Sequence, residues 1–161
     1  MAALAGFEST TGTKGYVALG EPAGGAYTAS ALAALVWQPI VGLRMFPEWG
    51  DTHSDVTDPV VGEGRVLHQN GAADGGEVAL PVQHRETDPG GDILKEAAGT
   101  DDIVTVLKVY PSGDGEVASG VVGNGRRDQA AQNSVRGRSY VLRVNTAVTD
   151  LTAADVTTAL A

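Results

Sequence analysis

The sequence predicts a mainly β domain of the α+β class, a small β-sandwich or barrel flanked by one short helix at about residues 89–98, with a long loop and terminal arms. Segments with alternating apolar residues recur along the chain, and one of them is rich in β-branched residues. A single core segment combines a helix-start signal with apolar residues on one side. Several short strands with one helix are typical of a capped sandwich or barrel.

A strand and then the helix follow one another within Glu77–Ala98. Val78, Leu80 and Val82 alternate with other residues, which is the pattern of a half-buried strand. Pro81 cannot donate a backbone hydrogen bond, so it indicates an edge strand or a bulge.

The helix is predicted from its two ends and its apolar stripe. The Asp88 carboxylate can accept from the first free amides, and Pro89 at the first helical position gives up only an amide that has no partner. Gly99 stands where a left-handed stop residue belongs. Asp92 adds negative charge to the first turn, and the apolar side is formed by Ile93, Leu94, Ala97 and Ala98.

The remaining strands are predicted on both sides of this unit. Ile103–Tyr110 reads as a central strand ended by Pro111–Gly113. Leu35–Phe46 holds strand-forming residues, but Pro39 and Gly42 favour a bend over a continuous central strand. Two further strands are predicted at Glu116–Val122 and Arg138–Asn145.

The 161 residues suit one domain, and we expect its core at about residues 35–148. Residues 1–34 are rich in Gly, Thr and Ala and are expected to form an N-terminal arm. Residues 149–161 are expected to form a C-terminal arm, with Leu151, Val156 and Leu160 at near-helical spacing.

Two connections are longer than a compact monomer needs. Pro47–Gly76 is mostly polar and rich in turn residues, with a short hairpin expected through Val60–His68. Gly123–Arg136 is polar and basic and has no apolar period. Loops above about fifteen residues are usually functional or disordered. A core with such loops and arms is suited to contacts with neighbouring subunits.

Composition restricts the function classes. The chain has no cysteine, which excludes disulfides, thiolate metal sites and thiol nucleophiles. It has no run of eighteen apolar residues, and Met1–Leu19 lacks the pattern of a signal peptide, so we expect a soluble, unprocessed protein without a membrane partner. The formal net charge of −9 argues against adhesion to nucleic acid.

The charges are distributed unevenly. Acidic residues dominate before residue 80, where the basic residues are Lys14, Arg44 and Arg65. This asymmetry is explained either by a solvated acidic face or by two complementary faces of a repeating assembly. The basic residues of the second half group at Arg126, Arg127, Arg136, Arg138 and Arg143.

No chemical site is indicated, and we expect neither an enzyme nor a cofactor. Asp51, Asp55 and Asp58 do not match the spacing of a calcium loop, and His53, His68 and His84 are far apart. Two Gly-rich segments lack the context of a phosphate-binding loop. These segments are Gly62–Gly71 and Val121–Arg127. Ser134, His84 and Asp128 have the residue types of a catalytic triad, but no nucleophile-elbow pattern surrounds the serine.

The order of elements resembles the tail tube proteins of long-tailed bacteriophages, also called major tail proteins. The similarity covers roughly Leu35–Val148 and is most specific over Val78–Pro111, where strand, turn, Asp-Pro-Gly helix start and the strand IVTVLKVYP follow one another. The Gly-rich strand EVASGVV continues the pattern. Members of that family form hexameric rings that stack into a tube.

This resemblance implies a structural virion protein of the phage tail, assembled in the host cytoplasm. It implies that Pro47–Gly76 contacts an adjacent ring and that the terminal arms bridge subunits. The implied partners are other copies of this chain, the tape measure protein, the tail terminator and the distal tail protein. DNA would pass through an acidic lumen without specific binding.

The candidate contact residues lie in or next to the two long connections. Trp37 is expected in the core, whereas Phe46 and Trp49 at the start of the polar loop are candidates for an inter-subunit anchor. Arg126 and Arg127 are candidates for pairing with a neighbour's acidic loop. Four further candidate contacts are Asp51, Asp55, Asp58 and Arg65.

Two other function classes stay open at this point. Another ring-forming phage structural protein, such as a tail terminator or head decoration subunit, would form closed rings or trimers and no open-ended tube. A ligand-binding β-sandwich would be a stable monomer with a concave aromatic site.

Overall fold

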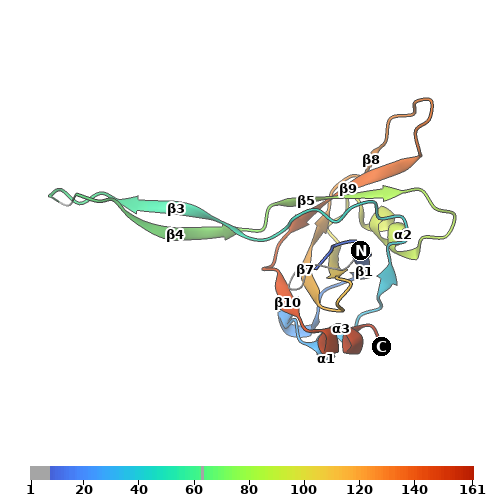
Figure 1. Cartoon of the computed structure of the whole chain (residues 1–161), viewed down its shortest axis with the longest axis horizontal. Helices are drawn as coiled ribbons and strands as arrows, with labels where there is room; N and C mark the ends of the chain where they lie inside the picture. Colours follow the sequence, from blue (N-terminus) through green and yellow to red (C-terminus); the bar gives the residue numbers. More distant parts are fainter. Residues whose placement is uncertain (1–7, 63) are drawn as a thin grey trace.

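One curled antiparallel sheet, a half-barrel, organises the molecule (Figure 1). The computed structural model describes residues 8–62 and 64–161. Along the main path the strand order is β2-β1-β6-β7-β9-β5, with β10 paired to β7 and β8 paired to β9. The strands of this sheet are β1 (Lys14–Leu19), β2 (Gln38–Pro39), β5 (Glu77–Gln83), β6 (Ile103–Val109), β7 (Gly115–Val122), β8 (Arg126–Arg127), β9 (Gly137–Val144) and β10 (Thr149–Leu151).

The core lies on both faces of the sheet because β6 and β7 are buried on both sides. Val104 and Val106 of β6 pack into one hydrophobic cluster, whereas Leu107 packs into the other. Successive side chains of a strand point to opposite faces, so a β-branched run suits a central strand. The mainly β fold class and the central strand expected at Ile103–Tyr110 are confirmed.

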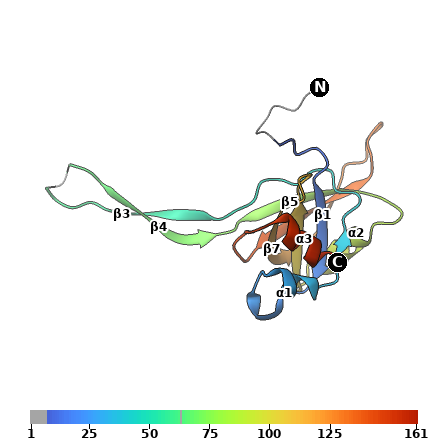
Figure 2. The same ribbon diagram turned by 60° about the horizontal axis from the view of Figure 1, so that its bottom comes forward.

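Helices cover both faces. α2 (Pro89–Ala97) packs Leu94 and Ala97 into the cluster that contains Val104. On the opposite face, α1 (Ala29–Ala33) and α3 (Ala153–Ala159) lie side by side (Figures 1 and 2). The 3-10 helix η1 (Ala23–Gly25) precedes α1. The sequence therefore identified the helix at about 89–98, and two further short helices complete the second face.

Asp88 joins the start of α2 to the chain segment beside it. Its carboxylate accepts from the amide of Gly91 at 2.9 Å, as expected for an N-cap, and from the amides of Val41 and Gly42 at 3.0 Å each. Gly42 must be glycine, because an added Cβ would lie 2.1 Å from the carbonyl oxygen of Gln83. The contact brings the segment after β2 against the edge strand β5.

The edge position expected from Pro81 is confirmed, since β5 is the last strand of the sheet among the described residues and pairs along its length with β9. Backbone bonds from Gln83 N to Gly42 O and from Arg44 N to Pro81 O cover part of its outer side. The expected bent strand at Leu35–Phe46 is correspondingly short. Only Gln38–Pro39 is a strand, with one isolated bridge at Leu43, because Asp88 and Gly42 hold the rest as a turn.

The expected terminal arms need correction. Residues 1–7 lie outside the described residues, but Lys14–Leu19 forms β1, paired on both sides, with Val17 and Ala18 fully buried. Its six residues lie in a Gly- and Thr-rich context that hid the strand. At the other end, β10 pairs with β7, and Thr152 and Asp155 form a capping box that starts α3 on the core.

The long polar connection is a projecting β-hairpin. β3 (Thr52–Asp58) pairs with β4 (Leu67–Asp74) as a separate two-stranded sheet that extends far from the body (Figures 1 and 2). We expected a shorter hairpin through Val60–His68, and that segment instead contains the far turn. Strand THSDVTD carries little apolar sequence, because it has no core to face. Among the described residues, no helix is both long and apolar enough to cross a membrane.

Candidate assembly surface

The β3–β4 hairpin exposes nearly all of its side chains to solvent. Its register places Asp55, Thr57 and His68 on one face, where His68 Nδ1 lies 2.8 Å from Asp55 Oδ2. The other face carries Val56 and Leu67, which are 49% and 59% exposed. An isolated two-stranded hairpin is at best marginally stable in water, and exposed apolar side chains mark contact surfaces. The hairpin therefore has the properties of an element that is completed by a neighbour.

The root of the hairpin is fixed by a cluster of five side chains, the root cluster: Phe46, Trp49, Lys108, Tyr110 and Glu116. Trp49 Nε1 donates to Glu116 Oε2 at 2.6 Å, and Tyr110 OH donates to Glu116 Oε1 at 2.8 Å. The rings of Phe46 and Trp49 meet edge to face at 4.9 Å. Lys108 Nζ lies 3.7 Å from Glu116 Oε2 and over the rings of Phe46 and Tyr110. These contacts hold the chain where it leaves the body.

The carboxylate of Glu116 is the electrostatic centre of the root cluster. Its partial burial opposes ionisation, but the hydrogen bonds from Trp49 and Tyr110 and the charge of Lys108 outweigh this effect. The pKa of Glu116 is therefore lowered from its usual value of 4.5. Glu116 is therefore ionised at neutral pH, where its contacts hold the root cluster together.

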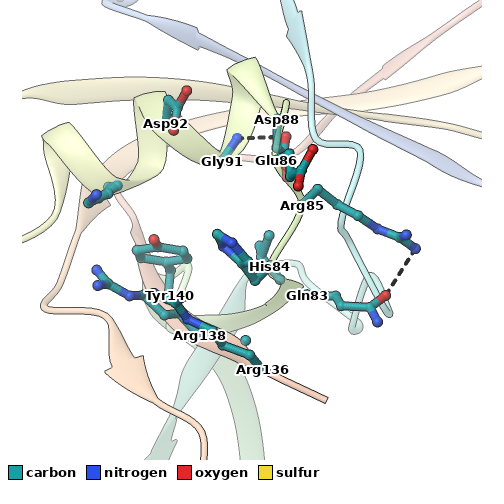
Figure 3. A pocket seen from close by; sticks show the side chains of 13 residues that line it. Gln83, His84, Arg85, Glu86, Asp88, Gly91, Asp92, Arg136, Arg138 and Tyr140 are labelled. Carbon is teal, nitrogen blue, oxygen red and sulfur yellow. Dashed lines mark hydrogen bonds between the residues drawn. The ribbon is translucent and has the colours of Figure 1, made fainter.

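A cleft beside α2, here called the α2 cleft, lies between the segment that follows β5 and the start of β9 (Figure 3). It holds about 180 Å³. Burial raises the pKa of Tyr140, and neighbouring Arg138 partly opposes that rise. Small-molecule sites typically hold about 300–1,000 Å³ and are mainly apolar, so this cleft is a poor match for one. Its lining includes His84 and seven acidic or basic residues: Arg85, Glu86, Asp88, Asp92, Lys95, Arg136 and Arg138.

The structure separates the predicted contact residues into two groups. Asp51, Asp55 and Asp58 lie at the base of the hairpin and on β3, and Arg65 lies in its far turn. The second group, Arg126 and Arg127, forms β8 on the opposite side of the body (Figure 1). All of these side chains are exposed.

The aromatic candidates are partly buried against the body of the chain. Trp37 was expected in the core; it is partly buried and packs against the cluster that contains Leu107, and its Nε1 donates to the Leu32 carbonyl at 2.9 Å. Phe46 and Trp49, expected as inter-subunit anchors, pack against the core cluster and make the root contacts described above. They are thus placed to orient the hairpin, and a direct contact with a neighbour remains a prediction.

The side chains weighed as chemical sites have other partners. Ser134 Oγ donates to the Ala131 carbonyl at 2.7 Å, and Asp128 forms an ion pair with Arg44 at 3.1 Å. His84 lines the α2 cleft. Within residues 8–62 and 64–161, no group of three His, Asp or Glu side chains is arranged to hold a metal ion.

Sequence reasoning missed Glu116 and Lys108 as the partners of the hairpin root. A signal was present, because the strands before and after Pro111–Gly113 form a hairpin in which Lys108 and Glu116 are opposite one another. The contact between Trp49 and Glu116 spans 67 positions in the sequence, so no local pattern predicts it.

Two solved structures share this fold at very low sequence identity. A chain in the 6-fold symmetrised cryo-EM structure of the anti-feeding prophage baseplate matches with a TM-score of 0.61 and 10% identity, covering 95% of this chain and 99% of that one. A chain in the cryo-EM structure of the PVC sheath/tube terminator, from an extracellular contractile injection system in the extended state, matches at 0.59 and 8%, covering 92% and 100%. No family model and no curated protein matches the sequence. The shared feature is therefore the fold of phage-tail-like assembly components.

Proposed function

We propose that this chain is a structural protein of a phage tail or a phage-tail-like particle, and that it assembles as stacked hexameric rings into a tube. Its role is mechanical and electrostatic, with no catalysis and no cofactor. The tube would provide a channel through which DNA passes without specific binding. Copies of this chain are the principal partners, and the tape measure, tail terminator and distal tail proteins would be further partners.

The projecting hairpin is the observation that carries this proposal. Its apolar residues Val56 and Leu67 stay exposed within one chain, while the root cluster fixes where it leaves the body. An element that is fixed at its root and leaves apolar side chains exposed is suited to contact a neighbouring subunit.

The edge of the sheet supplies a second reason for assembly. Only the far part of β5, near Val82, is bridged by another segment of the described chain, so Glu77–Leu80 presents an open side. Open edges are aggregation liabilities that a closed ring of subunits can cover. The fold likeness to a chain of a 6-fold symmetrised baseplate agrees with ring formation.

The charge agrees with a passage role. A sequence pI of about 4.6 gives the protein a net negative charge at neutral pH, which disfavours adhesion to DNA phosphates.

The proposal is tested by light scattering and negative-stain microscopy of the purified chain over a concentration series, beside a variant without the hairpin. Thr52 and Asp74 are cross-strand partners, so residues 53–73 can be replaced by an Asn-Gly turn without disturbing the root cluster. We expect hollow tubes from the intact chain and a folded species that forms no tubes from the variant. Equal tube formation by both proteins would contradict the role of the hairpin.

A second candidate, a tube terminator, is favoured by the fold likeness to a chain of the sheath/tube terminator structure. A terminator would form closed rings that do not stack on one another. Single rings at every protein concentration, without tubes, would favour this alternative.

A further inference from the structure

The β3–β4 hairpin and helix α2, which contributes to the α2 cleft, lie toward opposite ends of the longest axis of the molecule (Figure 1). The β3–β4 hairpin extends from one end of the sheet, and α2 with the segment that follows β5 lies at the other. A contact between these two ends in different copies would be heterologous, because each copy would offer a different surface. Such contacts repeat from copy to copy and generate rings or filaments.

The hairpin end is acidic. Asp51 and Asp58 are exposed, and neither has a basic side chain within 4.0 Å among the described residues. Asp55 has His68 as its neighbour. Arg65 is the only Lys or Arg in the sequence between Asp51 and Asp74.

At the α2 cleft, most of the exposed charged side chains that form no ion pair with a described residue are basic. Arg85, Lys95 and Arg136 are exposed and form no ion pair with any described carboxylate. Arg85 donates to the side chain of Gln83 at 3.0 Å (Figure 3). Asp88 is buried and its carboxylate is occupied by backbone amides. Two exposed acidic side chains, Glu86 and Asp92, also line the cleft, so basic residues outnumber the acidic ones that remain available there.

Both ends also expose apolar side chains next to their charges. On the hairpin, Val56 and Leu67 share a face with Asp58. On the body, Val41 and Val135 are each 55% exposed. The Val41 amide binds Asp88 at the cleft, and Val135 directly precedes Arg136. The two ends therefore match in two independent properties, charge and apolar surface.

We propose that the α2 cleft, with Val41 and Val135 beside it, receives the β3–β4 hairpin of a second copy. The acidic side chains of the hairpin meet Arg85 and Arg136, and the face that carries Val56 and Leu67 covers the exposed valines. The inference rests on the proposed function, because it names the surface that binds the hairpin in the assembly. Charge complementarity at such a contact fixes register and excludes wrong partners.

A charge exchange tests this docking with full-length proteins. The double variant Arg85→Glu, Arg136→Glu should need at least about tenfold more protein to assemble, because like charges placed opposite one another cost more than about 1.4 kcal/mol. The hairpin variant Asp51→Lys, Asp58→Lys should show the same loss. A chain that carries all four changes should recover assembly, because the complementary charges are restored with their positions exchanged. Light scattering at about physiological salt measures all four proteins.

Lys14→Glu on β1 is the control, since Lys14 is exposed and lies outside the cleft and the hairpin, and it should assemble as the unmodified chain does. Circular dichroism should show that every variant is folded. If the unmodified chain forms tubes and the cleft variant assembles at the same concentration, or the fourfold variant fails to recover, the docking is wrong and the proposed function stands. A chain that stays monomeric at all concentrations contradicts both.

Discussion

Glu116 offers the sharpest stability test, because one carboxylate holds three side chains of the root cluster. The change Glu116→Gln keeps the shape of the side chain and removes its charge. Trp49 can still donate to the amide oxygen, and the amide nitrogen can still meet Tyr110, so neutral hydrogen bonds replace charged ones. The ion pair with Lys108 is lost.

The magnitude follows from the difference between charged and neutral hydrogen bonds. Hydrogen bonds to charged groups contribute about 1.5–3 kcal/mol each and neutral ones about 0.5–1.5 kcal/mol. The side chain of Glu116 is 23% exposed, so solvent screens part of this difference. We therefore expect Glu116→Gln to lower the free energy of unfolding by about 1–2 kcal/mol at pH 7.

Urea unfolding followed by tryptophan fluorescence measures this change, and hydrogen exchange reports whether the hairpin amides lose protection. Glu77→Gln is the matched control. Its ion pair with Arg143 is exposed on both sides, at 63% and 60%, and should contribute at most about 0.5 kcal/mol. A loss from Glu116→Gln no larger than that from Glu77→Gln would refute the role assigned to the root cluster.

The pH dependence supplies an independent check on the same residue. The pKa of Glu116 in the folded chain lies below its usual value of 4.5, so its stabilisation is complete above that value. It is lost as the pH falls through the lower pKa of the folded state. The stability difference between the unmodified chain and Glu116→Gln should therefore be constant near neutral pH and should shrink below about pH 4.5.

Three further predictions concern the core, the helix start and DNA. Leu94 is fully buried, so Leu94→Ala should cost about 3 kcal/mol in urea unfolding, and a loss under about 1 kcal/mol would contradict its core position. Asp88→Ala removes the acceptor of three backbone amides and should cost about 2–4 kcal/mol, whereas Asp88→Asn, which keeps one oxygen, should cost less. Assembled protein should not retard duplex DNA in a gel at about 0.1 M salt, and tight, salt-sensitive retardation would contradict a passage role.

Local sequence patterns were sufficient to predict those helices and strands whose signals lie within the element or directly beside it. Helix α2 could be predicted from Asp88, Pro89 and Gly99, because helix capping depends on residues a few positions apart. The structure has the Asp88 N-cap, and Gly99 after the helix has a φ of +77°. The run Ile103–Tyr110 predicts a central strand because burial on both faces favours β-branched and apolar residues on both sides of the strand. Pro81 likewise indicated an edge.

The missed elements obtain their structure from distant contacts. β1 is short and lies among glycines and threonines, and it is a strand because β6 and β2 pair with it. The hairpin is polar on most of its surface, so alternation gave no signal, and only cross-strand pairing defines it. The root cluster joins residues 67 positions apart, and the basic cleft joins the segment after β5 to the start of β9. The uneven distribution of acidic and basic residues along the sequence was the one feature that indicated a difference in charge between the hairpin and the α2 cleft.

Cryo-electron microscopy of the intact chain at high concentration tests the proposed assembly most directly. Class averages viewed along the particle axis should show six subunits around a hollow centre, and side views should show stacked rings joined by the hairpins. Monomers at every concentration, or rings of another order that never stack, would contradict a tube-forming protein.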